Sequence, residues 1–298
     1  MDSKVIICAL ARDCADSLTK NIRRIEKLRK YFSVCDILVI ENDSKDRTKE
    51  ILQEWMESSK GVFCEMKDYG TATIPESVAG TVLPSYSKHR ISKMIRYRNM
   101  YLDWIERRSE KYDYVIVLDI DANWFSYKSI IKALSNAPDD FGAITANGRH
   151  FFNFQSFYYD TYAFAEKEDS LIIPDTVCGD GYRKESIRIR KLITKKYLPV
   201  SSAFGGLAVY KYKAIEGIRY CLVENANEYV EVQCEHIHFN KQIRDRGYKV
   251  YIAKDMDLII NSSWYSWKYP LKQFVCKNST IRSFLLKYNI IEWKQHEL

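Results

Sequence analysis

The chain has 298 residues, of which 46% are hydrophobic and 29% charged, with a formal net charge of +7. This length allows one large core or two modest ones, and the composition, poor in Gly and Pro, is that of a globular protein. The absence of any stretch of about eighteen apolar residues argues against a transmembrane segment. The N-terminus is a poor signal peptide and a good first strand, because its apolar run is brief and soon meets an aspartate.

Strand and helix patterns alternate through the first half of the chain. Apolar runs predict strands at 4–10, 36–40, 62–66, 113–119 and 142–146. Helical spacing predicts helices at 16–31, 46–58, 89–110 and 126–135, and Asp46 is expected to cap the second of these. A loop with Gly70, Pro75, Gly80 and Pro84 follows the third strand. This order predicts an α/β fold, a mostly parallel sheet with right-handed crossovers.

The fourth strand ends in two aspartates, Asp119 and Asp121, separated by one residue. In an extended chain, residues two apart point to the same side, so both carboxylates are able to face one Mg²⁺ or Mn²⁺ ion. The ends of buried parallel strands are also where open α/β sheets bind ligands. The alternative is a solvated turn followed by a helix cap, since aspartate favours both.

The second half is less regular. Residues 151–164 are rich in aromatics, 166–185 are polar with a turn at 179–181, and 188–196 fit a helix. The remaining segments predict a strand at 203–210 that contains Gly205 and Gly206, a helix at 232–246 and a strand at 248–253. No break in composition and no repeat divides the chain, so we expect one continuous domain.

The cysteines and basic residues bear on the cellular compartment and on the binding partners, but less specifically than the motifs do. The eight cysteines contain no C-x-x-C pair, which favours buried free thiols in a reducing compartment and a cytoplasmic location. Basic residues concentrate modestly at 20–30, 88–98 and 183–196. These stretches are interpreted as solvated helix faces, with attraction to phosphates, anionic glycans or a membrane surface as the alternative. Peripheral membrane contact therefore stays open, no nucleic-acid partner is expected, and the oligomeric state is not predicted.

Six motifs, in this order along the chain, resemble a known family. They are ALARDC, IENDSKDRT, MIRYRNMYL, VLDIDAN, GGLAVYK and CEHIHF. They are similar to those of the fungal capsule-associated (alpha-1,3-)mannosyltransferase group of GT-A glycosyltransferases. The resemblance implies a GT-A Rossmann-like sheet flanked by helices, a nucleotide-sugar-binding half at 1–150, and an irregular acceptor-binding half with a C-terminal helix at 151–298.

The resemblance also implies an activity and a set of ligands. It implies a metal-dependent enzyme that uses Mn²⁺ or Mg²⁺ and transfers a hexose from GDP-mannose or a UDP-sugar to a hydroxyl of a glycan or glycoconjugate. Two other functions stay open. One is a Mg²⁺-dependent phosphohydrolase with Asp119 as nucleophile, and the other is a non-catalytic sugar-binding protein on the same fold.

The same motifs imply which residues bind the donor. Guanidinium groups pair well with phosphate oxygens, and a carboxylate after the second strand is able to accept hydrogen bonds from ribose or base. Glycines let the backbone approach a ligand closely. The expected donor-binding residues are Arg12, Glu41, Asn42, Asp43, Arg96, Arg98, Asn99, Asp119, Asn147, Gly205 and Gly206.

The C-E-H segment stands where GT-A enzymes place an x-E-D motif, the usual source of an inverting base. Glu235 and His236 are therefore the expected catalytic residues, with Glu235 preferred. On the predicted helix Glu235 and His238 share a face, from which His236 points away. The resemblance implies a further histidine ligand after the last strand, but no histidine occurs between residues 239 and 295. His238 is the candidate third metal ligand beside Asp119 and Asp121, with His236, Asp255, Asp257, or water and the diphosphate as the alternatives.

Overall fold

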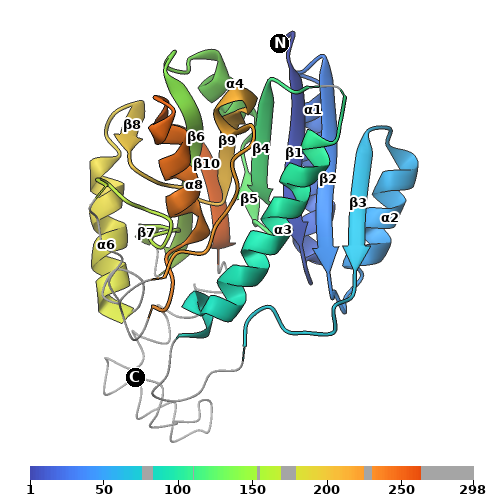
Figure 1. Cartoon of the computed structure of the whole chain (residues 1–298), viewed down its shortest axis with the longest axis horizontal. Coiled ribbons are helices and arrows are strands. Elements are labelled where there is room, and N and C mark those ends of the chain that lie inside the picture. The colour runs from blue at the N-terminus through green and yellow to red at the C-terminus, as the bar shows by residue number, and fades with distance from the viewer. Residues whose placement is uncertain (76–82, 110, 153–154, 169–178, 225–229, 263–298) are drawn as a thin grey trace, which may run out of the picture.

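The computed structural model describes residues 1–75, 83–109, 111–152, 155–168, 179–224 and 230–262. The C-terminal helix expected after the last strand lies outside these residues, as do Gly80, Cys178 and Cys276. Figure 1 shows a twisted sheet with helices packed against it. Its described strands are β1 Lys4–Ala11, β2 Val34–Asn42, β3 Val62–Lys67, β4 Tyr114–Asp119, β5 Trp124–Phe125, β6 Phe141–Phe152, β7 Gln155–Tyr158, β8 Tyr197–Val200, β9 Leu207–Lys211 and β10 Lys249–Ser262.

The described strands pair in the order β3-β2-β1-β4-β9-β6-β10-β5, with β7 on β6 and β8 on β10. The pairs β3–β2, β2–β1 and β1–β4 are parallel, as is β6–β10. Strand β1 is buried on both faces, with Val5, Ile6 and Ile7 at 0% exposure, as a central parallel strand requires. The predicted α/β fold, with a parallel core sheet flanked by helices, is confirmed.

Strand β9 departs from the predicted order. It runs antiparallel to both β4 and β6 and separates them, which the predicted succession of parallel strands did not include. An antiparallel strand needs no crossover helix. The order of helices and strands in the sequence therefore gave no indication that β9 lies between β4 and β6. Strand β9 consequently carries the Gly205–Gly206 turn to the end of β4.

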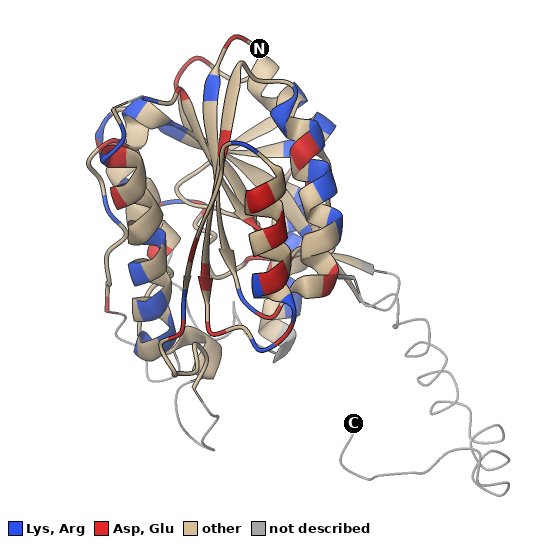
Figure 2. Cartoon of the chain, turned by 90° about the vertical axis from the view of Figure 1, so that its right-hand side faces the viewer, with Lys and Arg blue, Asp and Glu red and all other residues tan. Residues whose placement is uncertain are grey.

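Helices cover both faces of the sheet, as Figures 1 and 2 show. Helices α3, α6 and α8 pack on one face with the core that contains Ile6 and Cys8, and α1, α2 and α4 pack on the other face with Val5 and Ile7. This division follows the period-two alternation of β1. The described helices are α1 Ala15–Arg29, α2 Thr48–Ser58, α3 Lys88–Glu106, α4 Tyr127–Ser135, α6 Gly179–Leu192, α7 Tyr212–Ile215 and α8 Glu235–Asp245, with the 3-10 turn η1 Pro84–Tyr86.

Several boundaries differ from the predicted ones. Helix α6 starts at Gly179, so the residues predicted as a turn at 179–181 form its first turn. Helix α3 ends at Glu106 rather than at residue 110, and β6 and β10 extend well past the predicted strands at 142–146 and 248–253. These strands lengthen because they pair with each other along most of their length, and such long-range pairing overrides local propensity.

The basic stretch of α1 is a solvated helix face. Lys20, Arg23 and Lys27 are exposed on it, whereas Leu18 and Ile25 are buried beneath. Figure 2 shows Lys and Arg spread over the outer surfaces of the helices. Within the described part of the chain, no helix has the length and apolar character needed to cross a membrane. The six described cysteines form no disulfide.

Candidate active site

A cavity of about 440 Å³ opens at the carboxyl ends of β1, β2 and β4 and is walled on one side by α3. This is the edge at which parallel α/β sheets place their ligands. Seven of the residues expected from the sequence line the cavity, and they come from five segments of the chain. They are Arg12, Asn42, Arg98, Asp119, Asp121, Glu235 and His236.

Asp119 and Asp121 both line the cavity, but not because the chain stays extended between them. Asp119 is the last residue of β4, and the chain then turns, with the Ala122 N–H donating to the Asp119 carbonyl at 3.1 Å. Neither aspartate caps the next helix. The cap of α4 is Ser126, whose Oγ accepts from the Ser129 N–H at 3.2 Å. The alternative of a helix cap is thus wrong for this pair.

Negative charge gathers at the base of the cavity. Burial, together with the charge of neighbouring Asp121, raises the pKa of Asp119 well above its usual value. Asp160 lines the same cavity, and burial raises its pKa to about 6 although it accepts hydrogen bonds from the N–H groups of Ala163 and Gly205. Carboxylates placed in this way favour a cation between them.

These residues fit a divalent ion held by only two protein ligands. Carboxylate oxygens are the donors that Mg²⁺ and Mn²⁺ prefer, and Mg²⁺ usually takes one or two carboxylates plus water and phosphate oxygens. Within the described ranges no three His, Cys, Asp or Glu side chains are grouped closely enough to hold a metal ion by themselves. The structure does not bring His238 to Asp119 and Asp121, since His238 lies outside the cavity lining.

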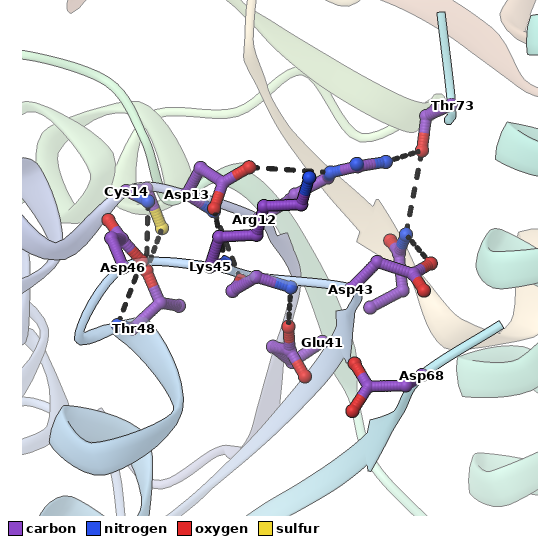
Figure 3. Close-up of polar contacts among 12 residues, drawn as sticks. Arg12, Asp13, Cys14, Glu41, Asp43, Lys45, Asp46, Thr48, Asp68 and Thr73 are labelled. Carbon is purple, nitrogen blue, oxygen red and sulfur yellow. Dashed lines mark hydrogen bonds and ion pairs between the residues drawn. The ribbon is translucent and has the colours of Figure 1, made fainter. Parts of the chain in front are cut away.

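Arg12 reaches the cavity from the end of β1. Its Nη1 donates to Thr73 Oγ1 at 2.7 Å, and its Nε lies 3.5 Å from Asp13 Oδ2 (Figure 3). Thr73 belongs to the segment after β3 that also lines the cavity. Asn42 donates from Nδ2 to Asp43 Oδ2 at 3.0 Å. Arg12 and Asn42 thus stand on the wall formed by the ends of β1 and β2.

Glu41 and Asp43 lie behind this wall rather than on it. Asp43 Oδ1 accepts from the N–H groups of Tyr69 and Gly70, both at 2.7 Å, and so fixes the start of the segment that carries Thr73. Desolvation raises the pKa of Asp43, but these hydrogen bonds outweigh it and leave the pKa below its usual value. Glu41 is fully buried and accepts from the Ser44 N–H at 2.8 Å. Glu41 and Asp43 therefore hold the backbone around the end of β2, where the nucleoside is expected to bind, but neither side chain lines the cavity.

Backbone strain marks the same two strand ends. Asp13 and Asp43 are the non-glycine residues with positive φ in the described part of the chain, at 44° and 54°. Aspartate tolerates this left-handed conformation better than most residues because its side chain bonds to nearby backbone. Asp13 Oδ1 accepts from the Lys45 N–H at 2.7 Å, which joins the two turns (Figure 3).

Arg98 and Glu235 form a buried ion pair in the wall. Arg98 Nε lies 3.0 Å from Glu235 Oε1, and each side chain is 5% exposed. The Arg98 guanidinium also lies over the ring of Phe204, 5.0 Å from its centroid. One oxygen of the expected base is therefore already bound to a cation.

His236 is packed as an aromatic ring. It stacks on Phe204 with ring centroids 4.0 Å apart, and its edge meets Tyr220. Both ring nitrogens are buried, and neither has a hydrogen-bond partner in the described residues. Burial and the charge of Arg98 lower the pKa of His236 well below its usual value, so the ring is neutral. Glu235 and His236 both line the cavity, because they are the first two residues of α8 and this end of the helix meets it.

Three expected donor-binding residues are engaged elsewhere. The Arg96 guanidinium lies over the Tyr69 ring at 4.5 Å. Both polar ends of the Asn99 amide bond to the backbone of Tyr220. Asn147 donates to the Lys254 carbonyl and accepts from Arg190 Nη1. None of the three lines the cavity.

Gly205 and Gly206 act through close backbone packing. Their φ angles are +64° and +81°, and a Cβ on Gly205 would lie 2.4 Å from the Ala146 carbonyl oxygen. The Gly206 carbonyl accepts a hydrogen bond from the Asp119 N–H at 2.8 Å. The glycine turn therefore holds the backbone of Asp119, the last residue of β4, in place. The pair shapes the floor of the site rather than its lining.

Gly205→Ala is expected to lower the free energy of unfolding more than Gly217→Ala, a matched control. Both residues have positive φ, which costs an alanine about 1–2 kcal/mol, but a Cβ on Gly217 meets nothing within 4 Å. The clash at Gly205 should add about 1–3 kcal/mol. Urea denaturation of the two variants measures the difference in the free energy of unfolding. Equal losses would show that the close contact between residue 205 and Ala146 does not contribute to stability.

Sequence reasoning missed several residues of the lining. The aromatic segment with Tyr159 and Asp160 was interpreted as sugar stacking or core packing, not as a source of charge for the cavity. Tyr97, Tyr162 and Arg90 were not singled out. The Arg90 guanidinium donates to the Ser85 carbonyl at 3.0 Å, and its charge lowers the pKa of Asp121 against the larger effect of burial. No local signal distinguishes Arg90 from its basic neighbours, because only the packing of α3 decides which one meets the cavity.

Comparison with known proteins gives the family. The family model described as cryptococcal mannosyltransferase 1 matches residues 4–242, and no curated protein matches the chain. Three similar solved structures are the mannosyltransferase PcManGT from Pyrobaculum calidifontis in complex with GDP-Man and Mn²⁺, S. aureus TarS 1-349, and GalNAc-T7 with UDP, GalNAc and Mn²⁺. Their TM-scores are 0.47, 0.47 and 0.48 and their identities 13%, 10% and 13%.

The matches cover 92%, 92% and 87% of this chain, which spans 62%, 64% and 44% of theirs, less than two thirds in each case. The family assignment rests on the sequence match. That match spans the ends of β1, β2 and β4, Asp119 and Asp121, and the Glu235 segment. The chain belongs to the cryptococcal mannosyltransferase 1 family, which confirms the family resemblance carried by its motifs.

Proposed function

We propose that this protein transfers a hexose from a nucleoside diphosphate sugar to a hydroxyl of a glycan or glycoconjugate, in a reaction that depends on Mn²⁺ or Mg²⁺. GDP-mannose is the first candidate donor, and UDP-sugars are the second. The observation that carries the proposal is one cavity that joins Asp119 and Asp121 with Arg12 and Arg90, in a chain of a mannosyltransferase family.

The charges of the cavity suit a nucleoside diphosphate and a metal ion together. Asp119 and Asp121 would hold the ion, which supplies Lewis-acid stabilisation of the leaving diphosphate. Arg12 and Arg90 both line the cavity, where they are placed to bind phosphate oxygens. Asn42 lines the cavity at the end of β2, where it would contact the nucleoside.

The acceptor hydroxyl must lose a proton to the protein or to water. Glu235 is the proposed recipient, since among the described residues its Oε2 makes only a 3.6 Å contact with Cys234 Sγ while Arg98 holds Oε1. Arg98 would hold the Glu235 carboxylate in place in the cavity wall. His236 contributes packing, because its nitrogens are buried and its ring is neutral.

Removal of divalent metal is expected to abolish transfer, and Mn²⁺ is expected to restore it. The test follows release of GDP or UDP from a panel of nucleotide sugars with sugar acceptors, in EDTA and after adding Mn²⁺ or Mg²⁺. In parallel, the correct donor with Mn²⁺ should raise Tm, since ligand at 100 times its Kd stabilises the folded state by about 2.7 kcal/mol.

The outcomes separate the competing functions. Transfer that is unaffected by EDTA would contradict the metal dependence. Release of inorganic phosphate from generic phosphomonoesters, without sugar transfer, would indicate a phosphohydrolase. Donor binding without turnover across the acceptor panel would indicate a sugar-binding protein.

A further inference from the structure

The side chain of Asn21 reaches from α1 to the turn that carries Asp121. Its Nδ2 donates to the Ile120 carbonyl at 2.8 Å and to the Ala122 carbonyl at 2.6 Å. Asn21 is fully buried, and these partners lie 99 and 101 residues away along the chain. Both N–H bonds of the amide are therefore used on the two carbonyls that flank Asp121.

Arg24, one turn further along α1, fixes the orientation of this amide. Its Nη1 donates to Asn21 Oδ1 at 2.8 Å. A guanidinium only donates hydrogen bonds, so it must face the amide oxygen and leave the amide nitrogen for the carbonyls. Arg24, Asn21 and the 120–122 backbone thus form a directed chain of hydrogen bonds.

The backbone of residues 120–122 depends on these hydrogen bonds, because the neighbouring strands of the sheet do not pair with it. The ladder between β4 and β1 ends at Asp119, paired with Leu10, and β9 pairs with β4 only as far as Leu118. Beyond that point the chain turns, and Ile120 and Ala122 are buried while Asp121 is exposed to the cavity. Asn21 ties down the backbone on both sides of Asp121.

We propose that Asn21, oriented by Arg24, is a positioning residue that sets the carboxylate of Asp121 for divalent-metal binding. This inference rests on the proposed function, in which Asp119 and Asp121 hold the ion. Partners that orient metal ligands typically change metal affinity by about 10–100-fold when they are removed. We expect a loss of that size in Mn²⁺ affinity from Asn21→Leu, which keeps the volume and removes both donors.

Asn240→Leu is the matched control. Asn240 is also fully buried, and its Nδ2 also donates two hydrogen bonds, to Ser202 Oγ at 2.9 Å and to the Ala203 carbonyl at 3.0 Å. It lies outside the cavity lining. The two variants should lose comparable stability, but only Asn21→Leu should bind Mn²⁺ more weakly.

Mn²⁺ titration followed by electron paramagnetic resonance measures the affinity, and hydrogen exchange of residues 119–125 in metal-free protein measures the order of the turn. We expect weaker Mn²⁺ binding and faster exchange in Asn21→Leu, with wild-type values in Asn240→Leu. Arg24→Met, at a half-buried position, is a milder second variant in case Asn21→Leu does not fold, and its Mn²⁺ affinity should also fall.

Each result bears on a different claim. Wild-type Mn²⁺ affinity in both Asn21→Leu and Arg24→Met would overturn the positioning role, as would an equal loss in Asn240→Leu. No Mn²⁺ binding by the wild-type protein would instead overturn the metal dependence of the proposed function, and the metal role of Asn21 with it. The exchange measurement in metal-free protein then still decides whether Asn21 orders the turn.

Discussion

Asp121→Asn is expected to lower kcat/KM for sugar transfer by at least about 10²–10³-fold, the size of effect seen when one group that stabilises developing charge is removed. The amide is a weaker ligand than the carboxylate and carries no charge to hold a divalent ion. Folding should not suffer, because the substitution removes the charge that, after burial, most raises the pKa of Asp119. Steady-state kinetics with saturating Mn²⁺ and thermal unfolding measure the two quantities.

Asp255→Asn is a suitable control for this experiment. Asp255 is an exposed aspartate paired with Lys132 at 2.8 Å, and it is not part of the cavity lining. Its neutralisation should leave kcat/KM within twofold, since surface ion pairs contribute about 0–1 kcal/mol to stability and nothing to the site. If Asp121→Asn kept full transfer activity in Mn²⁺, Asp121 would not be a metal ligand.

Arg98→Met is expected to lower the free energy of unfolding by about 3–5 kcal/mol, because it leaves the carboxylate of Glu235 buried without its partner. Each side chain of the pair is 5% exposed, so water does not replace the lost contact. The double variant Arg98→Met/Glu235→Leu should recover much of the loss, since buried ion pairs are often replaceable by apolar residues at little cost. Urea denaturation of the three proteins measures these terms.

The same pair separates structural support from catalysis. Glu235→Gln preserves shape, and as loss of a general base it should lower kcat by about 10²–10⁴-fold. The double variant should then be folded and inactive. If Glu235→Gln lost stability but kept its kcat, Glu235 would serve only to hold Arg98 in the wall, and the acceptor proton would have another recipient.

Several features of the protein were predictable from the sequence because they depend on local pattern. Successive side chains of a strand point to opposite faces of the sheet, so Ile6 and Ile7 in the apolar run of β1 pack into different cores, as the structure shows. A buried apolar run that ends in Asp119 and Asp121 had to deliver them to the edge of the sheet. The motifs also carried enough information to give the family.

Other features were decided only by tertiary packing. Arg96, Arg98 and Asn99 share one helix, yet only Arg98 meets the cavity, because Tyr69 and Tyr220 engage the other two. The partner of Arg98 is 137 residues away. Helical spacing specifies which residues share a face, but not which neighbour that face meets.

The sequence by itself determined an α/β fold, its family and the pair of aspartates at the end of the fourth strand. The tertiary structure alone decided that β9 enters between β4 and β6, that Asp160 and Arg90 join the cavity, and that Asn21 holds the turn around Asp121. The physical reason is the same in each case. These contacts join segments far apart in the chain, and their formation depends on packing that no local pattern encodes.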